Sequence, residues 1–132
     1  MWDLLKNFLL WGCLGLLVEV LFTGINSIWA GNKLATSRTY LWMLPIYGFA
    51  GLSFKLLYQY VHVGWLLQVP MWGFMILGYE YGSGWLLKKY IGACPWDYGN
   101  RKWSIHGLIR LDYVPYCLLL AGAQWYALSH VL

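Results

Sequence analysis

Charged side chains are scarce in this chain of 132 residues: Asp, Glu, Lys and Arg make up 11% of it, whereas apolar residues make up 61%. Soluble domains carry about 25% charged and about 45–50% apolar residues. A domain of this size still exposes roughly a third of the surface of its unfolded chain, which so few charges cannot cover in water. The composition therefore argues against a water-soluble domain and predicts that lipid solvates most of the surface.

Cysteine is also scarce, and the three residues present (Cys13, Cys94 and Cys117) have no spacing typical of a disulfide framework. Cys94 and His106 could supply at most two ligands, too few for a closed zinc site. His62 and His130 fall at the ends of apolar runs, where interfacial histidines are far commoner than haem ligands. We therefore expect no disulfide, no metal and no cofactor.

Four apolar runs are long enough to cross a hydrocarbon core of about 30 Å, which takes roughly 20 helical residues. They lie near residues 8–30, 41–61, 65–87 and 108–131. Backbone groups in lipid must bond within their own segment, which favours helices. The sequence predicts an all-α polytopic integral membrane protein: one domain over residues 1–132, with a four-transmembrane-helix bundle. The first run is too long for a removable signal and is expected to be retained.

Basic residues near the ends of these runs predict the orientation, because the cytoplasmic side normally carries their excess. One side would hold Lys33, Arg38, Lys88, Lys89, Arg101, Lys102 and Arg110, and the other Lys6 and Lys55. We therefore expect both termini outside a plasma or inner membrane, and loops 31–40 and 88–107 in the cytoplasm. The basic residues form no stripe interleaved with exposed aromatics, so no nucleic-acid partner is expected.

The first and third runs share a short pattern, in which a carboxylate is followed about one turn later by a hydroxyl and a glycine, at residues 19–24 and 80–84. The second and fourth runs each carry an early proline, Pro45 and Pro115. This weak similarity suggests two repeated helical hairpins of the same direction, although chance resemblance between apolar hairpins explains it equally well.

Acidic residues inside the apolar runs are the clearest functional signal, because an ionisable group near the bilayer centre costs about 2.5–3.5 kcal/mol. Glu19 and Glu80 should therefore face the interior of the bundle. Glu19 shares a helical stripe of small and polar residues with Gly12, Gly15, Thr23 and Asn26, and Glu80 shares one with Gly73, Ser83 and Gly84. Lys55 could pair with Glu19 from a neighbouring helix, or could extend outward to the interface instead.

A denser polar group is expected near the inner surface, where Glu80 approaches the residues that follow it. The group comprises Asp97, Arg101, His106, Arg110 and Asp112. One interpretation is an ion-pair network that fixes the loop on the bundle. The other is a cytoplasm-facing cavity whose cations receive an anionic headgroup or solute and whose carboxylate exchanges a proton.

The string Ala93-Cys94-Pro95-Trp96-Asp97-Tyr98, with residues 80–87 before it and 107–113 after it, resembles the transmembrane protein 229 family, within the wider CmpB-like group labelled "putative ABC-transporter type IV". Residues 19–23 and 46–48 also share in the resemblance. It implies a polytopic membrane protein whose motif residues correspond to Glu80, Trp96, Asp97, Tyr98, Gly107 and Asp112. Gly99 and His106 depart from the pattern, which usually has serine and, in bacterial members, often asparagine. The chain has no phosphate-binding loop of the Gly-x-x-x-x-Gly-Lys-[Ser/Thr] type, so an ATP-driven role would need a separate ATPase subunit.

Three functions remain open from the sequence. The first is permease-like handling of a small solute or lipid headgroup, with Glu19 and Glu80 in a polar pathway and membrane lipids, a second copy or another membrane subunit as partners. The second is a membrane enzyme acting on a lipid headgroup by acid–base chemistry, although no activated nucleophile is evident. The third is an accessory or assembly subunit whose charges are structural.

Overall fold

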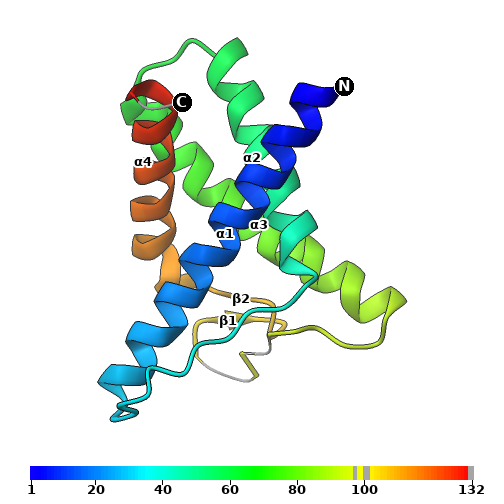
Figure 1. The fold of residues 1–132 in the computed structure, drawn as a ribbon, viewed down its shortest axis with the longest axis vertical. Helices are drawn as coiled ribbons and strands as arrows, with labels where there is room; N and C mark the ends of the chain where they lie inside the picture. Colours follow the sequence, from blue (N-terminus) through cyan, green and yellow to red (C-terminus); the bar gives the residue numbers. More distant parts are fainter. Residues whose placement is uncertain (97, 100–101, 131–132) are drawn as a thin grey trace. The chain divides into compact units, whose positions relative to one another are not determined.

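The computed structural model describes residues 1–96, 98–99 and 102–130, and the chain is mostly helical (Figure 1). Its four α-helices in this part are α1 (Trp2–Trp29), α2 (Met43–Tyr60), α3 (Trp65–Tyr90) and α4 (Val114–His130). The prediction of a mostly helical chain with four helices is confirmed.

Residues 104–113 differ from the all-α prediction. Strands β1 (Ser104–Ile105) and β2 (Ile109–Arg110) form an antiparallel hairpin, and a 3-10 turn, η1 (Leu111–Tyr113), connects it to α4. Helix α4 consequently begins at Val114, six residues after the expected start of the fourth apolar run. The hairpin turn explains this, because His106 and Gly107 have φ of 53° and 70°, as mirror-image hairpin turns require.

The chain divides into two compact units, Met1–Phe54 and Lys55–Leu132. In the first unit, α1 packs against the start of α2 through glycines on both helices. A Cβ added at Gly12 would lie 2.8 Å from the Leu44 carbonyl oxygen, and one at Gly15 would lie 2.3 Å from Cγ of Tyr47. These two glycines therefore form a close helix contact, as the small-residue stripe around Glu19 predicts.

The segment between α1 and α2 lies against α1 within the first unit. Thr23 on α1 holds it, because the Thr23 hydroxyl oxygen accepts a hydrogen bond from the Arg38 backbone N–H at 2.9 Å. Gly24 also faces this segment, with Ala35 O 3.4 Å from the position of an added Cβ. The connection therefore covers part of the polar face of α1.

In the second unit α3 packs along α4. A Cβ added at Gly73 would lie 2.8 Å from Cδ2 of Leu118, which makes Gly73 a point of close approach. Trp72 and Ala121 are fully buried, and Leu77, Ile109 and Cys117 form a hydrophobic cluster beside the hairpin. This packing places the hairpin against the second half of α3.

Within the described residues, α1 is the helix that is long and apolar enough to cross a membrane. It has 28 residues, and many of its apolar side chains are exposed, including Leu17 at 54% and Leu21 at 55%. Helices α2 and α4 are shorter, with 18 and 17 residues. Helix α3 has 26 residues, but polar groups such as Gln68 and Glu80 interrupt its apolar stretch.

Candidate functional site

The segment after α3 folds back over that helix at Gly84. A Cβ at Gly84 would lie 2.9 Å from Cδ2 of Leu108 and 3.1 Å from Cζ2 of Trp96, so the absence of a side chain lets both residues approach the helix closely. The Trp96 indole N–H donates to the Leu108 carbonyl oxygen at 2.9 Å, and the Tyr98 backbone N–H donates to the Gly107 carbonyl oxygen at 3.0 Å. Trp96 and Tyr98 thus attach the segment that follows α3 to the turn of the β1–β2 hairpin.

Glu80, on α3, accepts a hydrogen bond from the Tyr98 hydroxyl, with 2.5 Å between the phenol oxygen and Oε1. Both side chains are half-buried. Burial raises the pKa of the Tyr98 phenol, and the nearby Glu80 carboxylate raises it further. Tyr98 therefore remains protonated, and able to donate, through the neutral and mildly alkaline range. Glu80 thus contacts the loop that follows α3, and the contact is its hydrogen bond with Tyr98.

Arg110 is held by two neighbours on its own segment. Its Nε donates to Asp112 Oδ1 at 3.0 Å, its Nη2 also bonds to Asp112, and its Nη1 donates to the Tyr113 hydroxyl at 3.0 Å. The guanidinium carbon lies 4.3 Å from the centre of the Tyr113 ring and 5.9 Å from that of Tyr98. The Arg110–Asp112 pair is bidentate, which satisfies both carboxylate oxygens.

The rings of Tyr98 and Tyr113 connect these two groups. Their centres are 5.8 Å apart and their planes are inclined by 86°. Such edge-to-face contacts contribute about 0.5–1.5 kcal/mol beyond the area that they bury. Glu80, Tyr98, Tyr113, Arg110 and Asp112 consequently form one polar cluster at the second half of α3, which we call the Glu80 cluster.

His106 lies beside this cluster and contacts a different face of α3. Its Nδ1 is 2.9 Å from the Tyr81 hydroxyl, and the two rings are 5.9 Å apart. Asp97 and Arg101, which the sequence also places in this group, lie outside the described residues. Among the residues that are described, no three His, Cys, Asp or Glu side chains gather closely enough to hold a metal ion.

Glu19 belongs to the other unit, where its partners are hydroxyl groups. The Thr39 hydroxyl donates to Glu19 Oε2 at 2.8 Å, and the Tyr47 side chain also hydrogen bonds to this carboxylate. Lys55 is a half-buried residue of α2 at the start of the second unit. The pairing of Glu19 with Lys55, and a cavity shared by Glu19 and Glu80, stay predictions.

Several residues of these sites do not follow from the sequence patterns. Tyr113 could have been found, since it lies three residues after Arg110 and next to Asp112. Thr39 and Tyr47 could not, because only the path of the segment between α1 and α2 brings Thr39 back to Glu19, and only helix packing brings Tyr47 there.

Replacing Tyr98 with Phe tests the Glu80 contact. The change removes the hydroxyl but keeps the ring against Tyr113, so we expect a loss of about 1.5 kcal/mol of unfolding free energy. Amide hydrogen exchange at Trp96 and Tyr98 should become faster. The exposed Tyr90 provides the control, and Tyr90→Phe should leave both measurements unchanged. Unchanged exchange in Tyr98→Phe would contradict the importance of this bond.

No solved structure matches the chain. A sequence model of the family described as "Putative ABC-transporter type IV" matches residues 6–132, a range that includes both acidic sites and the whole hairpin. The chain therefore belongs to the "Putative ABC-transporter type IV" family.

Proposed function

We propose that this protein is an integral membrane protein of permease type that handles a small solute or a lipid headgroup at a polar, cytoplasm-facing site. Membership of an ABC-transporter family supports the membrane location, as does the apolar length of α1. Large exposed apolar side chains on the other helices also favour lipid as the solvent, among them Phe74 at 65% and Leu119 at 72%.

In this proposal all four helices cross the bilayer as two hairpins, with both termini outside and with loops 31–40 and 88–107 in the cytoplasm. The resemblance to the transmembrane protein 229 family belongs to the same proposal. Four helices leave little room for a central route, so we expect a second copy or another membrane subunit to complete the pathway. An ATP-driven mechanism would require a separate ATPase subunit.

The hydrogen bond between Tyr98 and Glu80 is the observation that carries this proposal. It joins an acidic side chain of an apolar helix to a segment outside the helices, so a change at Glu80 can be transmitted to that segment. An intramembrane acid is costly and marks a functional pathway in many membrane proteins. We infer that Glu80 exchanges a proton as the solute passes and that Tyr98 reports its state to the loop.

Flux measurements with Glu80→Gln test the proposal. The full chain is reconstituted in phosphatidylcholine–phosphatidylglycerol vesicles that contain a pH-sensitive dye, and phosphate, bicarbonate, glycine or choline is added outside. We expect at least one solute to change the internal pH about tenfold faster than in protein-free vesicles. This ratio corresponds to a barrier that is lower by about 1.4 kcal/mol. Glu80→Gln should return that rate to the protein-free value.

Glutamine keeps the shape of Glu80 and can still accept the Tyr98 hydrogen bond, so the fold should persist. Asp3→Asn is the matched control, since it removes an acid at the exposed start of α1 and should leave the flux unchanged. Full flux in Glu80→Gln would assign Glu80 a structural role. If the internal pH changes at the same rate with and without the protein for every solute, the permease proposal is wrong.

An accessory or assembly subunit is the second candidate, and one observation favours it. Arg110 is already paired with Asp112 in a bidentate contact, and its Nη1 bonds to Tyr113. A phosphate or carboxylate ligand would have to displace Asp112 to be held in the same way. This arrangement suits an ion pair that fixes the hairpin, and it disfavours Arg110 as the anion clamp of a headgroup enzyme.

A further inference from the structure

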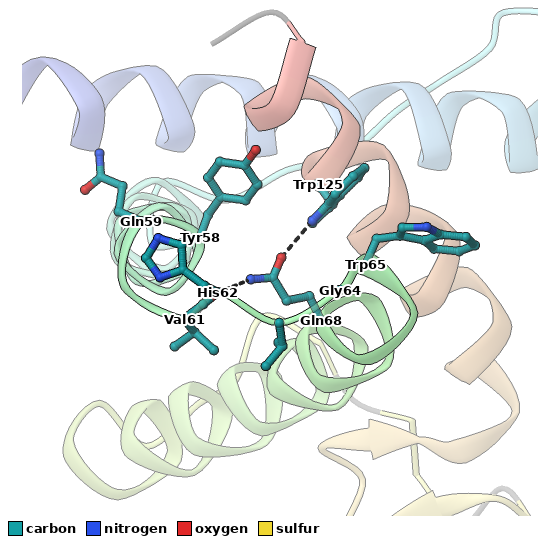
Figure 2. A pocket seen from close by; sticks show the side chains of 9 residues that line it. Tyr58, Gln59, Val61, His62, Gly64, Trp65, Gln68 and Trp125 are labelled. Atoms are coloured by element: carbon teal, nitrogen blue, oxygen red, sulfur yellow. Dashed lines mark hydrogen bonds between the residues drawn. The ribbon is translucent and has the colours of Figure 1, made fainter.

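A pocket of about 500 Å³ lies where α2 ends and α3 begins (Figure 2). Its walls come from the last turn of α2, the turn between the helices, the start of α3 and one residue of α4. Pockets of about 300–1,000 Å³ are typical of sites for small molecules. This pocket is separate from the Glu80 cluster, because Gln68 and Glu80 are twelve residues apart on α3, which is about 18 Å along a helix.

Gln68 forms the buried floor of the pocket, with 2% of its surface exposed. Its Nε2 donates to the Val61 carbonyl oxygen at 2.6 Å, and its Oε1 accepts from the Trp125 indole N–H at 2.7 Å. The first bond fixes the turn between α2 and α3, and the second fixes Trp125. The pocket therefore has a rigid floor and one rigid aromatic wall.

Aromatic rings form the neighbouring walls. The rings of Tyr58 and Trp125, which both line the pocket, have centres 6.3 Å apart and planes inclined by 72°, so they meet edge to face. Figure 2 shows His62 beside Tyr58, across the same space from Trp125. The faces of aromatic rings carry negative potential and attract cations.

The residue types in the lining indicate which kind of cation the pocket can bind. Among the described residues that line the pocket, none is Asp, Glu, Lys or Arg. A primary ammonium has three N–H donors that need acceptors, whereas a quaternary ammonium has none and is recognised by aromatic faces. An aromatic lining without a carboxylate consequently favours a quaternary ammonium group over a primary ammonium or an anion.

We propose that this pocket binds a quaternary ammonium group. The group could belong to a free small solute or to a choline lipid headgroup, since both present the same trimethylammonium surface. The proposal goes beyond the function proposed for the Glu80 cluster and does not depend on it.

Calorimetric titration of the full chain in dodecyl maltoside tests the proposal. The two probes are choline chloride and 3,3-dimethylbutan-1-ol, which has the shape of choline without its charge. We expect saturable choline binding that is at least tenfold tighter than binding of the neutral probe. Equal affinities would identify a merely apolar pocket and overturn the proposal, as would the absence of choline binding.

Variants of Tyr58 assign the binding to this pocket. Tyr58→Leu removes one wall without touching the Gln68 bonds, and it should weaken choline binding about tenfold. Tyr58→Phe keeps the ring and should bind choline as the unchanged protein does. Tyr60→Leu is the matched control, because Tyr60 lies on the same helix, is 77% exposed and does not line the pocket. Unchanged binding in Tyr58→Leu would overturn the assignment. If this variant fails to fold, the comparison of the two probes on the unchanged chain still decides the proposal.

Lipid nanodiscs distinguish the two sources of the group. If a choline headgroup occupies the pocket, free choline should bind more weakly in phosphatidylcholine discs than in phosphatidylglycerol discs. If a free solute is the natural ligand, the two affinities should be equal. Both results support the proposal, whereas loss of choline binding in phosphatidylglycerol discs would overturn it.

Discussion

Gln68→Leu is expected to lower the unfolding free energy by about 1–3 kcal/mol, because it removes both hydrogen bonds of a buried side chain and leaves two half-buried polar groups without their partner. These groups are the Val61 carbonyl oxygen and the Trp125 indole N–H, which Gln68 joins at 2.6 and 2.7 Å. Leucine fills a similar volume, so lost hydrogen bonds rather than a cavity account for the loss. Equilibrium unfolding of the full chain in mixed dodecyl maltoside–SDS micelles measures the effect.

Gln59→Leu is the matched control for this prediction. Gln59 also lines the pocket, but it is exposed at the end of α2. Its replacement should change the unfolding free energy by less than about 0.5 kcal/mol, as is usual for surface substitutions. Equal losses in the two variants would contradict the role assigned to Gln68.

A double-mutant cycle with Trp125→Phe separates the two bonds of Gln68. Each single variant leaves one partner of the Gln68–Trp125 bond unsatisfied, whereas the double variant removes both. The loss in the double variant should therefore be smaller than the sum of the single losses, by about 0.5–3 kcal/mol. Additive losses would mean that the bond contributes little to the stability of the fold.

The helices could be predicted from the sequence because apolar runs in a chain with few charges leave few alternatives. Helix α1 ends at Trp29, one residue from its predicted limit, for this reason, although it begins at Trp2, six residues before the predicted start. The start of α4 could not be placed in this way, because Ile109 and Leu111 continue the apolar pattern. Their backbone conformation depends instead on pairing with residues 104–105, which is a contact between segments that hydropathy does not encode.

The candidate site was predictable to the extent that charge alone defines it. An acid in an apolar run needs a partner, and this reasoning identified Glu80 and the region of its contacts. It could not identify the partner as Tyr98, because Tyr98 lies in the middle of the loop predicted over residues 88–107, and hydropathy does not encode how that loop folds back on α3. Gln68 escaped notice because a lone glutamine carries no charge, and its importance depends on the approach of Trp125 from α4.

Gly51→Ala is also expected to lower the unfolding free energy strongly, because Gly51 lies at a close contact between α1 and α2 in the first unit. A Cβ at this position would lie 2.2 Å from both Cβ and Cγ of Trp11. These atoms lie at the base of the tryptophan side chain, so a rotamer change cannot move Trp11 Cβ away. Either the helices separate or the backbone shifts. Overpacking of this kind costs about 1–3 kcal/mol, and we expect the upper end of that range because both residues are buried.

Gly78→Ala is the matched control, because it makes the same chemical change within a helix where an added Cβ meets no atom within 4 Å among the described residues. Alanine is a better helix former than glycine by about 0.8–1.0 kcal/mol, so this variant should unfold at a slightly higher denaturant fraction. The opposite signs of the two effects, measured in the same micelles, would identify packing of α1 against α2 as the cause. A stabilising Gly51→Ala would mean that α1 and α2 do not approach each other this closely in the membrane.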